Sequence, residues 1–312
     1  MNYIRKIEGQ NELNRMVNEL YKSQFSNNYI EMGPTSMFMP ESYGTFYKTV
    51  REFKVEDDDI FVTGYPKSGT RWVDEMVWLI VNNQNFELAR SLSLRRRITL
   101  LESDGFSNEK VRYMDTLLNM KRSRLIKTHL HWGFWPDDIT TYRKKPKIIV
   151  VHRQPEDVCL SQFHHNRTTR GFIGSFDDYC TLFLNGKVSF GPYWEQVLSI
   201  WEQRDKANII FIKYKEMKEN LPAVIGRVAK FLGKHVPNEK IPNMIEHLSF
   251  ESLKSSPGFN EKETLAKYNA DCNPYIREGK IGGYAAVMNP DIISKFKEMN
   301  CLKLFSVGIS FD

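Results

Sequence analysis

Residues 61–72, which read FVTGYPKSGTRW, join an apolar run to a loop of small and cationic residues. The run IFVT at 60–63 has the β-branched, apolar composition of a buried strand. The loop contains Lys67 and Arg71 but no acidic residue, so its polar side chains can all donate and none carries a negative charge. A glycine-containing loop between a strand and a helix can point backbone N–H groups at an anion, and the helix dipole favours that charge. The stretch therefore predicts an anion-binding loop at the end of a strand.

The composition is that of a globular protein. The chain has 312 residues, of which 41% are hydrophobic and 13% aromatic, and its net charge is +6. This length suffices for one large α/β domain or two smaller ones. The mild positive charge suits a small anionic ligand and is too diffuse to indicate nucleic acid. The basic runs at 95–97 and 144–147 lack interleaved aromatic residues, so we expect them to be solvated surface.

The cysteines and the hydropathy indicate a cytoplasmic protein without a membrane span. The four cysteines are widely spaced and form no CxxC pair, which favours reduced thiols over a disulfide framework or a zinc ribbon. The N-terminal residues are polar and lack the apolar core of a signal peptide. No apolar run approaches the length of a transmembrane helix.

Short apolar strands alternate with amphipathic helices along the chain. The predicted strands are 60–63, 124–130, 147–153 and 208–214. The predicted helices are 72–81, a segment that begins at Pro155, and 215–233. Continuous apolar strands that alternate with helices predict a parallel sheet buried on both faces.

Each predicted strand delivers a polar or cationic residue at its carboxyl end. Lys67 follows the first strand, and Lys127 and His129 end the second. Arg153 ends the third strand and Tyr214 the fourth. Because ligands of such sheets bind at the carboxyl ends of the strands, we expect these five residues to form one site. A ligand with several negative charges fits separated cations with no carboxylate nearby.

The stretch YPKSGTRW at 65–72 closely resembles the YPKSGTTW signature of the cytosolic sulfotransferases. These enzymes use 3′-phosphoadenosine 5′-phosphosulfate (PAPS) as the sulfuryl donor and release PAP. The similarity runs in ordered blocks from about Tyr43 to Gly283, at 127–130, 150–165, 174–197, 212–220, 247–257 and 277–283. It implies a P-loop-type three-layer α/β/α fold with a central parallel sheet. It also implies a single domain over 1–312, with an N-terminal extension of about 1–42 and a cofactor-capping loop at about 252–283.

The resemblance assigns the donor site residue by residue. It places the 5′-phosphosulfate on Lys67, Ser68, Gly69, Thr70 and Arg71. It places the 3′-phosphate on Arg153, Ser161, Arg277 and the backbone near Gly279. It places the adenine between Trp72 and Phe250, with Tyr214 and Ser249 at its edge.

For the reaction, the resemblance and the chemistry imply in-line transfer of the sulfuryl group to a hydroxyl or amine. His129 is the expected general base, Lys67 stabilises the leaving oxygen and Lys127 the sulfuryl group, with Ser161 also counted as catalytic. No metal ion is required. His129 and His131 could instead be a metal pair, but no Cys, Asp or Glu stands nearby in sequence to complete it.

Several residues depart from the family pattern. Arg71 replaces a threonine, Leu248 stands where a polar residue is common, and Glu278 replaces a lysine near the expected 3′-phosphate. The family's dimerisation motif is not recognisable at 284–296, so the oligomeric state stays open. These departures sustain an alternative, a homologue that binds a nucleotide or hydrophobic ligand without turnover. A P-loop nucleotide kinase is disfavoured because Lys67 precedes the second glycine instead of following it.

The acceptor is the least determined part of the prediction. The candidates for its pocket are Phe25, Leu100, Phe134, Phe163, His165 and Phe172. A largely apolar pocket next to His129 suits a small hydrophobic phenol, steroid, alcohol or amine. The sequence does not separate these classes.

Overall fold

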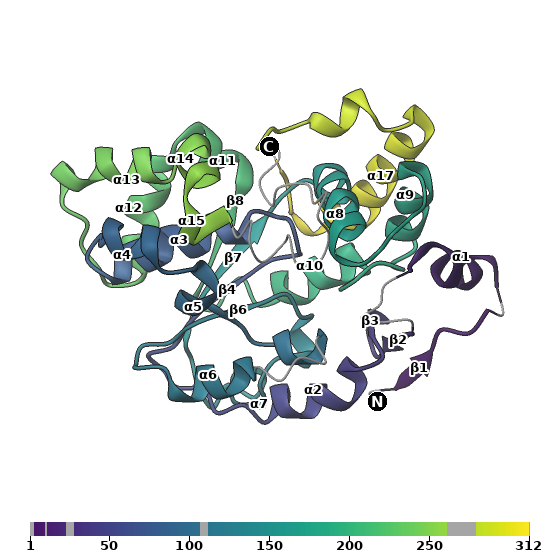
Figure 1. Cartoon of the computed structure of the whole chain (residues 1–312), viewed down its shortest axis with the longest axis horizontal. Helices are drawn as coiled ribbons and strands as arrows, with labels where there is room; N and C mark the ends of the chain where they lie inside the picture. Colours follow the sequence, from purple (N-terminus) through teal and green to yellow (C-terminus); the bar gives the residue numbers. More distant parts are fainter. Residues whose placement is uncertain (1–2, 10, 23–27, 107–111, 261–278, 312) are drawn as a thin grey trace.

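The fold is built on a five-stranded parallel sheet (Figure 1). The structure, a computed structural model, describes residues 3–9, 11–22, 28–106, 112–260 and 279–311. The strand order is β5-β6-β4-β7-β8. The bounds are β4 (Ile60–Thr63), β5 (Thr99–Leu100), β6 (Leu125–Thr128), β7 (Lys147–His152) and β8 (Ile209–Lys213). The four predicted strands are confirmed: β4 has the predicted bounds, and β6, β7 and β8 are slightly shorter than predicted. The strand β5 was not predicted.

Alternate residues of each strand face two separate apolar cores. Phe61 and Val150 belong to the core that contains α8 (Pro155–Thr169), α10 (Tyr193–Trp201) and α17 (Pro290–Lys303). Val62 and Ile149 belong to the core that contains α3 (Thr70–Val81), α12 (Leu221–Phe231) and α13 (Ile241–His247). These helix groups cover opposite faces of the sheet (Figure 1). The predicted three-layer α/β/α arrangement is therefore confirmed.

The described part of the predicted N-terminal extension contains a second sheet. Three antiparallel strands pair in the order β1 (Ile4–Lys6), β2 (Tyr29–Met32) and β3 (Met37–Pro40). The helix α1 (Glu12–Leu20) lies between β1 and β2 in the chain. Every residue of β2 and β3 is buried, and the backbone of Phe38 exchanges hydrogen bonds of 2.8 and 2.9 Å with residues 190–191. The strands β2 and β3 are thus part of the main core.

The other helices connect and cover these layers. The long stretch predicted at 215–233 is divided at Asn220 into two helices, because Pro222 can start a helix but cannot continue one. The remaining α-helices described are α2 (Tyr43–Arg51), α4 (Phe86–Ser91), α5 (Leu94–Arg97), α6 (Tyr113–Asn119), α7 (Asp137–Thr140), α9 (Phe176–Leu184), α11 (Tyr214–Glu219), α14 (Phe250–Ser255) and α15 (Pro257–Asn260). None of the helices within the described residues has the length and apolar composition needed to cross a membrane.

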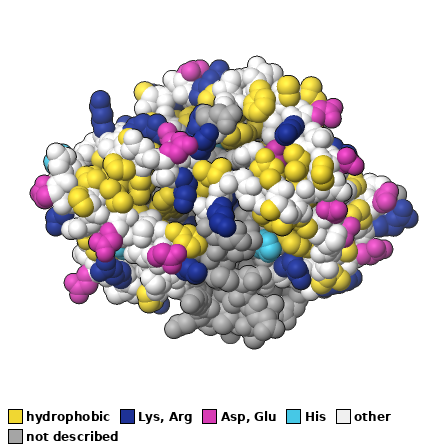
Figure 2. Space-filling model, turned by 90° about the horizontal axis from the view of Figure 1, so that it is seen from above, with side chains coloured by type: hydrophobic (Ala, Val, Ile, Leu, Met, Phe, Trp, Pro, Cys, Tyr) yellow, Lys and Arg dark blue, Asp and Glu magenta, His cyan; other side chains and the backbone are white. Residues whose placement is uncertain are grey.

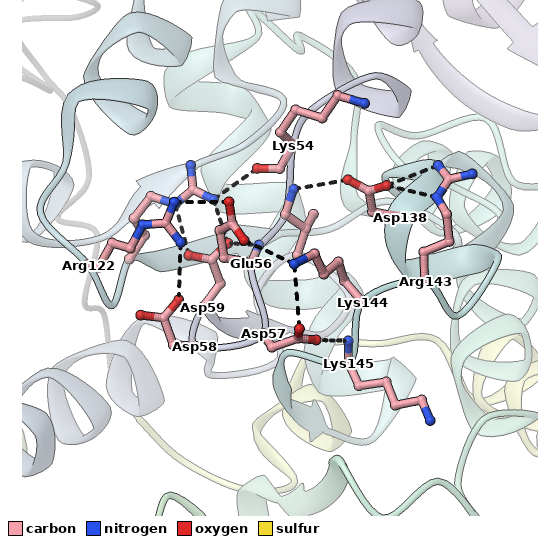
Figure 3. A network of polar contacts seen from close by, with 12 residues as sticks. Lys54, Glu56, Asp57, Asp58, Asp59, Arg122, Asp138, Arg143, Lys144 and Lys145 are labelled. Carbon is pink, nitrogen blue, oxygen red and sulfur yellow. Dashed lines mark hydrogen bonds and ion pairs between the residues drawn. The ribbon is translucent and has the colours of Figure 1, made fainter.

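A network of ion pairs holds the amino ends of the strands (Figure 3). Arg124, just before β6, forms a buried bidentate pair with Asp59, just before β4, at 2.6 and 2.8 Å. Glu56 pairs with Arg122 at 2.9 Å and with Lys144 at 3.1 Å. This network fixes the edge of the sheet opposite the predicted site, so it is structural.

Candidate active site

The loop between β4 and α3 requires glycine at two positions. At Gly64, φ is +153°, and a Cβ atom would lie 2.4 Å from the carbonyl oxygen of Val151. At Gly69, φ is +103°, and a Cβ atom would lie 2.6 Å from the ring of Tyr214. Lys67 between them also has a left-handed φ of +73°, which is uncommon for a side chain other than glycine. Such strain in a tightly packed loop is typical of a ligand-binding segment.

A cavity of about 430 Å³ opens at the carboxyl edge of the sheet. All five residues predicted from the strand ends line it: Lys67, Lys127, His129, Arg153 and Tyr214. Seen from above, Lys and Arg side chains gather around the middle of the molecule, between hydrophobic areas on either side (Figure 2). The structure thus brings together residues that lie up to 147 positions apart, from Lys67 to Tyr214.

The cations of the cavity repel one another. Burial, and then the charges of Arg71, Lys127 and Arg153, lower the pKa of Lys67 from 10.5 to about 7. Burial and the neighbouring cations thus disfavour the charged form of Lys67 in the free protein. A bound anion beside Lys67 would favour the charged form.

His129 is held in one tautomer by the backbone. Its Nδ1 lies 2.6 Å from the carbonyl oxygen of Gly64, which can only accept a hydrogen bond. Nδ1 therefore carries the proton, and Nε2 is left as the basic nitrogen. The backbone N–H of His129 donates to the carboxylate of Glu102 at 2.7 Å, which fixes the position of the residue. Burial and the charges of Lys127 and Lys67 lower the pKa of His129 to about 3, so the ring is neutral at physiological pH.

Two carboxylates line the same cavity, where the sequence predicted none nearby. Asp74 accepts a hydrogen bond of 2.8 Å from the ammonium of Lys127, and both side chains are largely buried. Asp157 lies 3.7 Å from the guanidinium of Arg153 and accepts the N–H of Gly282 at 2.9 Å. Each carboxylate is paired with a cation, so the cavity remains positive. Asp157 lies in the first turn of α8 and Asp74 one turn inside α3, where no strand-end argument would find them.

Aromatic residues form one end of the cavity. Trp72 lies edge-on to Tyr214 at 5.8 Å and donates through Nε1 to the Leu248 carbonyl at 2.9 Å. Phe250 packs so closely on Gly279 that a Cβ there would lie 2.8 Å from its ring. The residues Trp72, Tyr214, Leu248, Phe250 and Gly279 all line the cavity. A flat base could stack on this surface.

The other predicted donor-site residues lie at or beside the cavity. Thr70, Arg71 and Ser161 line it. Ser68 is 1% exposed and lies outside its lining, and the Ser249 hydroxyl caps α14 by accepting from the N–H of Ser252 at 3.2 Å. Arg277 and Glu278 lie outside the described residues.

Arg71 connects the loop to the segment beyond α14. Its guanidinium donates to the carbonyl oxygen of Phe259 and stacks over the Phe259 ring at 4.9 Å. This residue therefore ties the start of α3 to α15 as well as lining the cavity. The threonine usual in this family position is too short to make such a link.

The six predicted acceptor residues divide into three groups. Leu100 and His165 line the cavity. Phe134, Phe163 and Phe172 are 1–6% exposed in the apolar core and do not line the cavity. Phe163 packs there against the rings of Phe172 and Phe176. Phe25 lies outside the described residues.

The sequence also missed residues that line the cavity from helices and loops. These residues are Arg95, Ser103, Phe106, Tyr113, His164, Thr168, Thr169, Arg170 and Phe190. The run at 95–97 is not simple surface, because Arg95 lines the cavity and Arg97 is buried in an ion pair of 2.7 Å with Glu75. No local pattern distinguishes these residues from ordinary helix and loop positions.

His129 and His131 each contact a different backbone carbonyl group. His131 places Nε2 2.9 Å from the carbonyl oxygen of Phe190, while His129 faces Gly64. Within the described part of the chain, no cluster of three or more His, Cys, Asp or Glu side chains suits a metal ion.

Comparison with known proteins identifies a common family. A family model described as the sulfotransferase domain matches residues 57–305. Luciferin sulfotransferase of Photinus pyralis is 34% identical over 314 residues, which cover 95% of this chain and 85% of the relative. Sulfotransferase 1 family member D1 of Rattus norvegicus is 32% identical over 271 residues, which cover 85% and 90% respectively.

Solved structures share the fold. Retinol dehydratase in a complex with retinol and PAP matches with a TM-score of 0.89 at 24% identity, covering 100% of this chain and 99% of that one. A mouse sulfotransferase complexed with PAP matches with a TM-score of 0.70 at 25% identity, covering 87% and 93% respectively.

Proposed function

The chain belongs to the family of PAPS-dependent sulfotransferases and is an enzyme of that class, and we propose that it transfers the sulfuryl group of PAPS to a hydroxyl or amine of a small hydrophobic acceptor. The observation that carries this proposal is the single cavity in which Lys67, Lys127 and the basic Nε2 of His129 meet. One relative is named for luciferin, and retinol dehydratase binds retinol together with PAP, so both named ligands are small molecules.

The cavity fits the donor on its chemistry. The lowered pKa of Lys67, caused by burial and neighbouring cations, marks a place where a bound anion would stabilise the ammonium charge. The glycine-bounded loop, the N-terminus of α3 and Arg71 converge on that place. Arg153 suits the 3′-phosphate, and its guanidinium also stacks over Tyr214 at 4.3 Å. Trp72 and Phe250 suit the adenine.

For this reaction the chain's own residues supply a general base, stabilisation of the developing charge, and positioning of the reacting groups. PAPS supplies the transferable sulfuryl group. His129 accepts the acceptor's hydroxyl proton at Nε2, and the Gly64 carbonyl stabilises the imidazolium that forms. Lys67 and Lys127 stabilise the charge that develops during in-line transfer, and Asp74 orients the Lys127 ammonium. Positioning and electrostatics account for most of the rate, as in phosphoryl transfer.

The alternative, a homologue that binds without turnover, is not favoured by any residue described here. The three groups with assigned chemistry, Lys67, Lys127 and His129, all face the cavity. We also propose a cytoplasmic location, because the sequence resembles the cytosolic branch of the family.

The proposal is tested by incubating the purified protein with sulfur-labelled PAPS and a panel of phenols, steroids, alcohols and amines. We expect labelled product from the parent and a loss of about 10²–10⁴-fold in kcat for His129→Ala. The matched control is His235→Ala, because His235 is exposed and does not line the cavity. Tight binding of PAP with no labelled product from any acceptor would replace this proposal with the binding-protein alternative.

A further inference from the structure

The cavity has a donor half, lined by the residues proposed to bind PAPS, and an acceptor half, lined by the others. Two short helices, α14 and α15, form a wall of the donor half, and Phe250, Leu253 and Phe259 line the cavity from them. The side-chain amide of Asn260 donates to the carbonyl oxygen of Lys254 at 3.0 Å and so joins the two helices. Whatever holds this α14–α15 wall therefore also holds the surface proposed for the adenine.

Arg71 holds α15 from the side of the donor-binding loop. It lies in the first turn of α3, and its Nη2 group donates to the backbone carbonyl oxygen of Phe259. The last carbonyl groups of a helix have no partner within the helix, so this hydrogen bond satisfies one of them. The guanidinium also lies over the ring of Phe259, 4.9 Å from its centroid, in a cation–π contact. One side chain thus joins α3 to α15 through two kinds of contact.

The end of α4 holds α15 at a second point. A Cβ atom at Gly258 would lie 2.6 Å from the carbonyl oxygen of Ala89 and 2.8 Å from that of Arg90. The two backbones therefore approach so closely that only glycine leaves enough space. The helices α3, α4, α14 and α15 lie on the same side of the sheet (Figure 1). The α14–α15 wall is thus fixed by contacts with two other helices.

The contact between Arg71 and α15 is a departure from the family pattern. The resemblance assigns position 71, where the family has a threonine, to the 5′-phosphosulfate. Arg71 lines the cavity, so its charge acts on a bound donor in any case. Its contacts with Phe259, which a threonine is too short to make, add a second effect. This second effect depends on α15 and not on the phosphosulfate.

We propose that Arg71 is a positioning residue for the donor, which keeps the α14–α15 wall in place before PAPS binds. A wall that is already ordered loses less conformational entropy when the adenine binds against it, so the donor binds more tightly. The identity of the donor rests on the proposed sulfotransferase function. The role of Arg71 goes beyond that function, because it extends to the part of the donor that carries no sulfuryl group.

The test compares PAP with 3′-AMP, which has the same adenosine and 3′-phosphate but lacks the 5′-phosphate. We expect Arg71→Thr to weaken the binding of both nucleotides by about tenfold in a calorimetric titration. Gly258→Ala should also weaken both, because it displaces α15 from α4 without changing the donor-binding loop. The matched control is Arg90→Thr, which removes an arginine that is exposed and outside the cavity, and it should leave both affinities unchanged.

Hydrogen exchange of residues 250–260 in the free protein gives a readout that needs no ligand. We expect faster exchange in Arg71→Thr and Gly258→Ala than in the parent and in Arg90→Thr. Should Arg71→Thr fail to fold, Arg71→Lys keeps the charge but loses the planar stacking, and faster exchange is again expected.

The outcomes separate the inference from the function on which it rests. A loss of affinity confined to PAP would make Arg71 a ligand of the 5′-phosphate and would overturn the inference. Unchanged exchange of residues 250–260 in Arg71→Thr would also overturn it. A parent that binds neither nucleotide contradicts the proposed function, and the exchange measurement then decides alone whether Arg71 holds the wall.

Discussion

Binding of PAP is expected to be coupled to the protonation of Lys67. The pKa of this lysine is about 7 in the free protein, because it is buried among Arg71, Lys127 and Arg153. A polyanion beside it favours the charged form and returns its pKa toward the ordinary 10.5. The free protein must therefore take up a proton when PAP binds at any pH between these two values.

The size of the uptake follows from the fraction of Lys67 that is neutral before binding. With a pKa of about 7, that fraction is about 0.1 at pH 6, about 0.5 at pH 7 and about 0.9 at pH 8. The affinity for PAP should fall by about tenfold for each pH unit between 8 and 10. Binding takes up one proton in this range, and the proton concentration falls tenfold per pH unit. His129, with a pKa of about 3, contributes nothing in this range.

The assay is isothermal titration calorimetry at pH 6, 7 and 8 in buffers that differ in ionisation enthalpy. Glu102 also has a pKa of about 7, raised by burial, so the parent is compared with Lys67→Met, in which Glu102 remains. We expect the uptake to disappear in the variant. An uptake that is absent from the parent, or that persists undiminished in Lys67→Met, would refute the reasoning.

Other substitutions test separate parts of the site. Gly69→Ala should lower the free energy of unfolding by about 1–3 kcal/mol and weaken PAP binding, because the new Cβ clashes with Tyr214 at a positive φ. A thermal melt and a titration check this, and an unchanged Tm would contradict it. Arg153→Ala should weaken PAP binding by about 2–3 kcal/mol through the loss of a charge-assisted contact. The control is Arg204→Ala, on an exposed residue outside the cavity, and equal losses in both variants would remove Arg153 from the donor site. His129→Ala should retain PAP affinity while losing turnover, which titration and label transfer measure together.

The sheet could be predicted because its strands are short, apolar and buried on both faces. The segments that became β4, β6, β7 and β8 carry this signal in their own composition. The strand β5 has only two residues, Thr99 and Leu100, and its pairing with β6 is visible only in three dimensions. The strands β1 and β2 both mix polar and apolar residues, yet β1 is exposed and β2 is buried, so burial there depends on the surfaces that the strands meet.

The donor half of the site was predictable for a related reason. A residue at the end of a parallel strand reaches the same edge wherever it stands in the sequence, which placed Lys67, His129 and Arg153 together. The acceptor half has no such rule. Arg95 and Arg170 come from helices whose orientation follows from packing, and Phe163 was assigned to the pocket although it packs in the core.

The measurement that tests the central claim most directly is a crystal structure of the protein with PAP and a phenol. The account predicts PAP with its 5′-phosphate on residues 65–71 and its adenine against Trp72. It predicts the phenol oxygen within about 2.6–3.2 Å of Nε2 of His129. A phenol oxygen that faces away from His129, or PAP bound outside this cavity, would contradict the account.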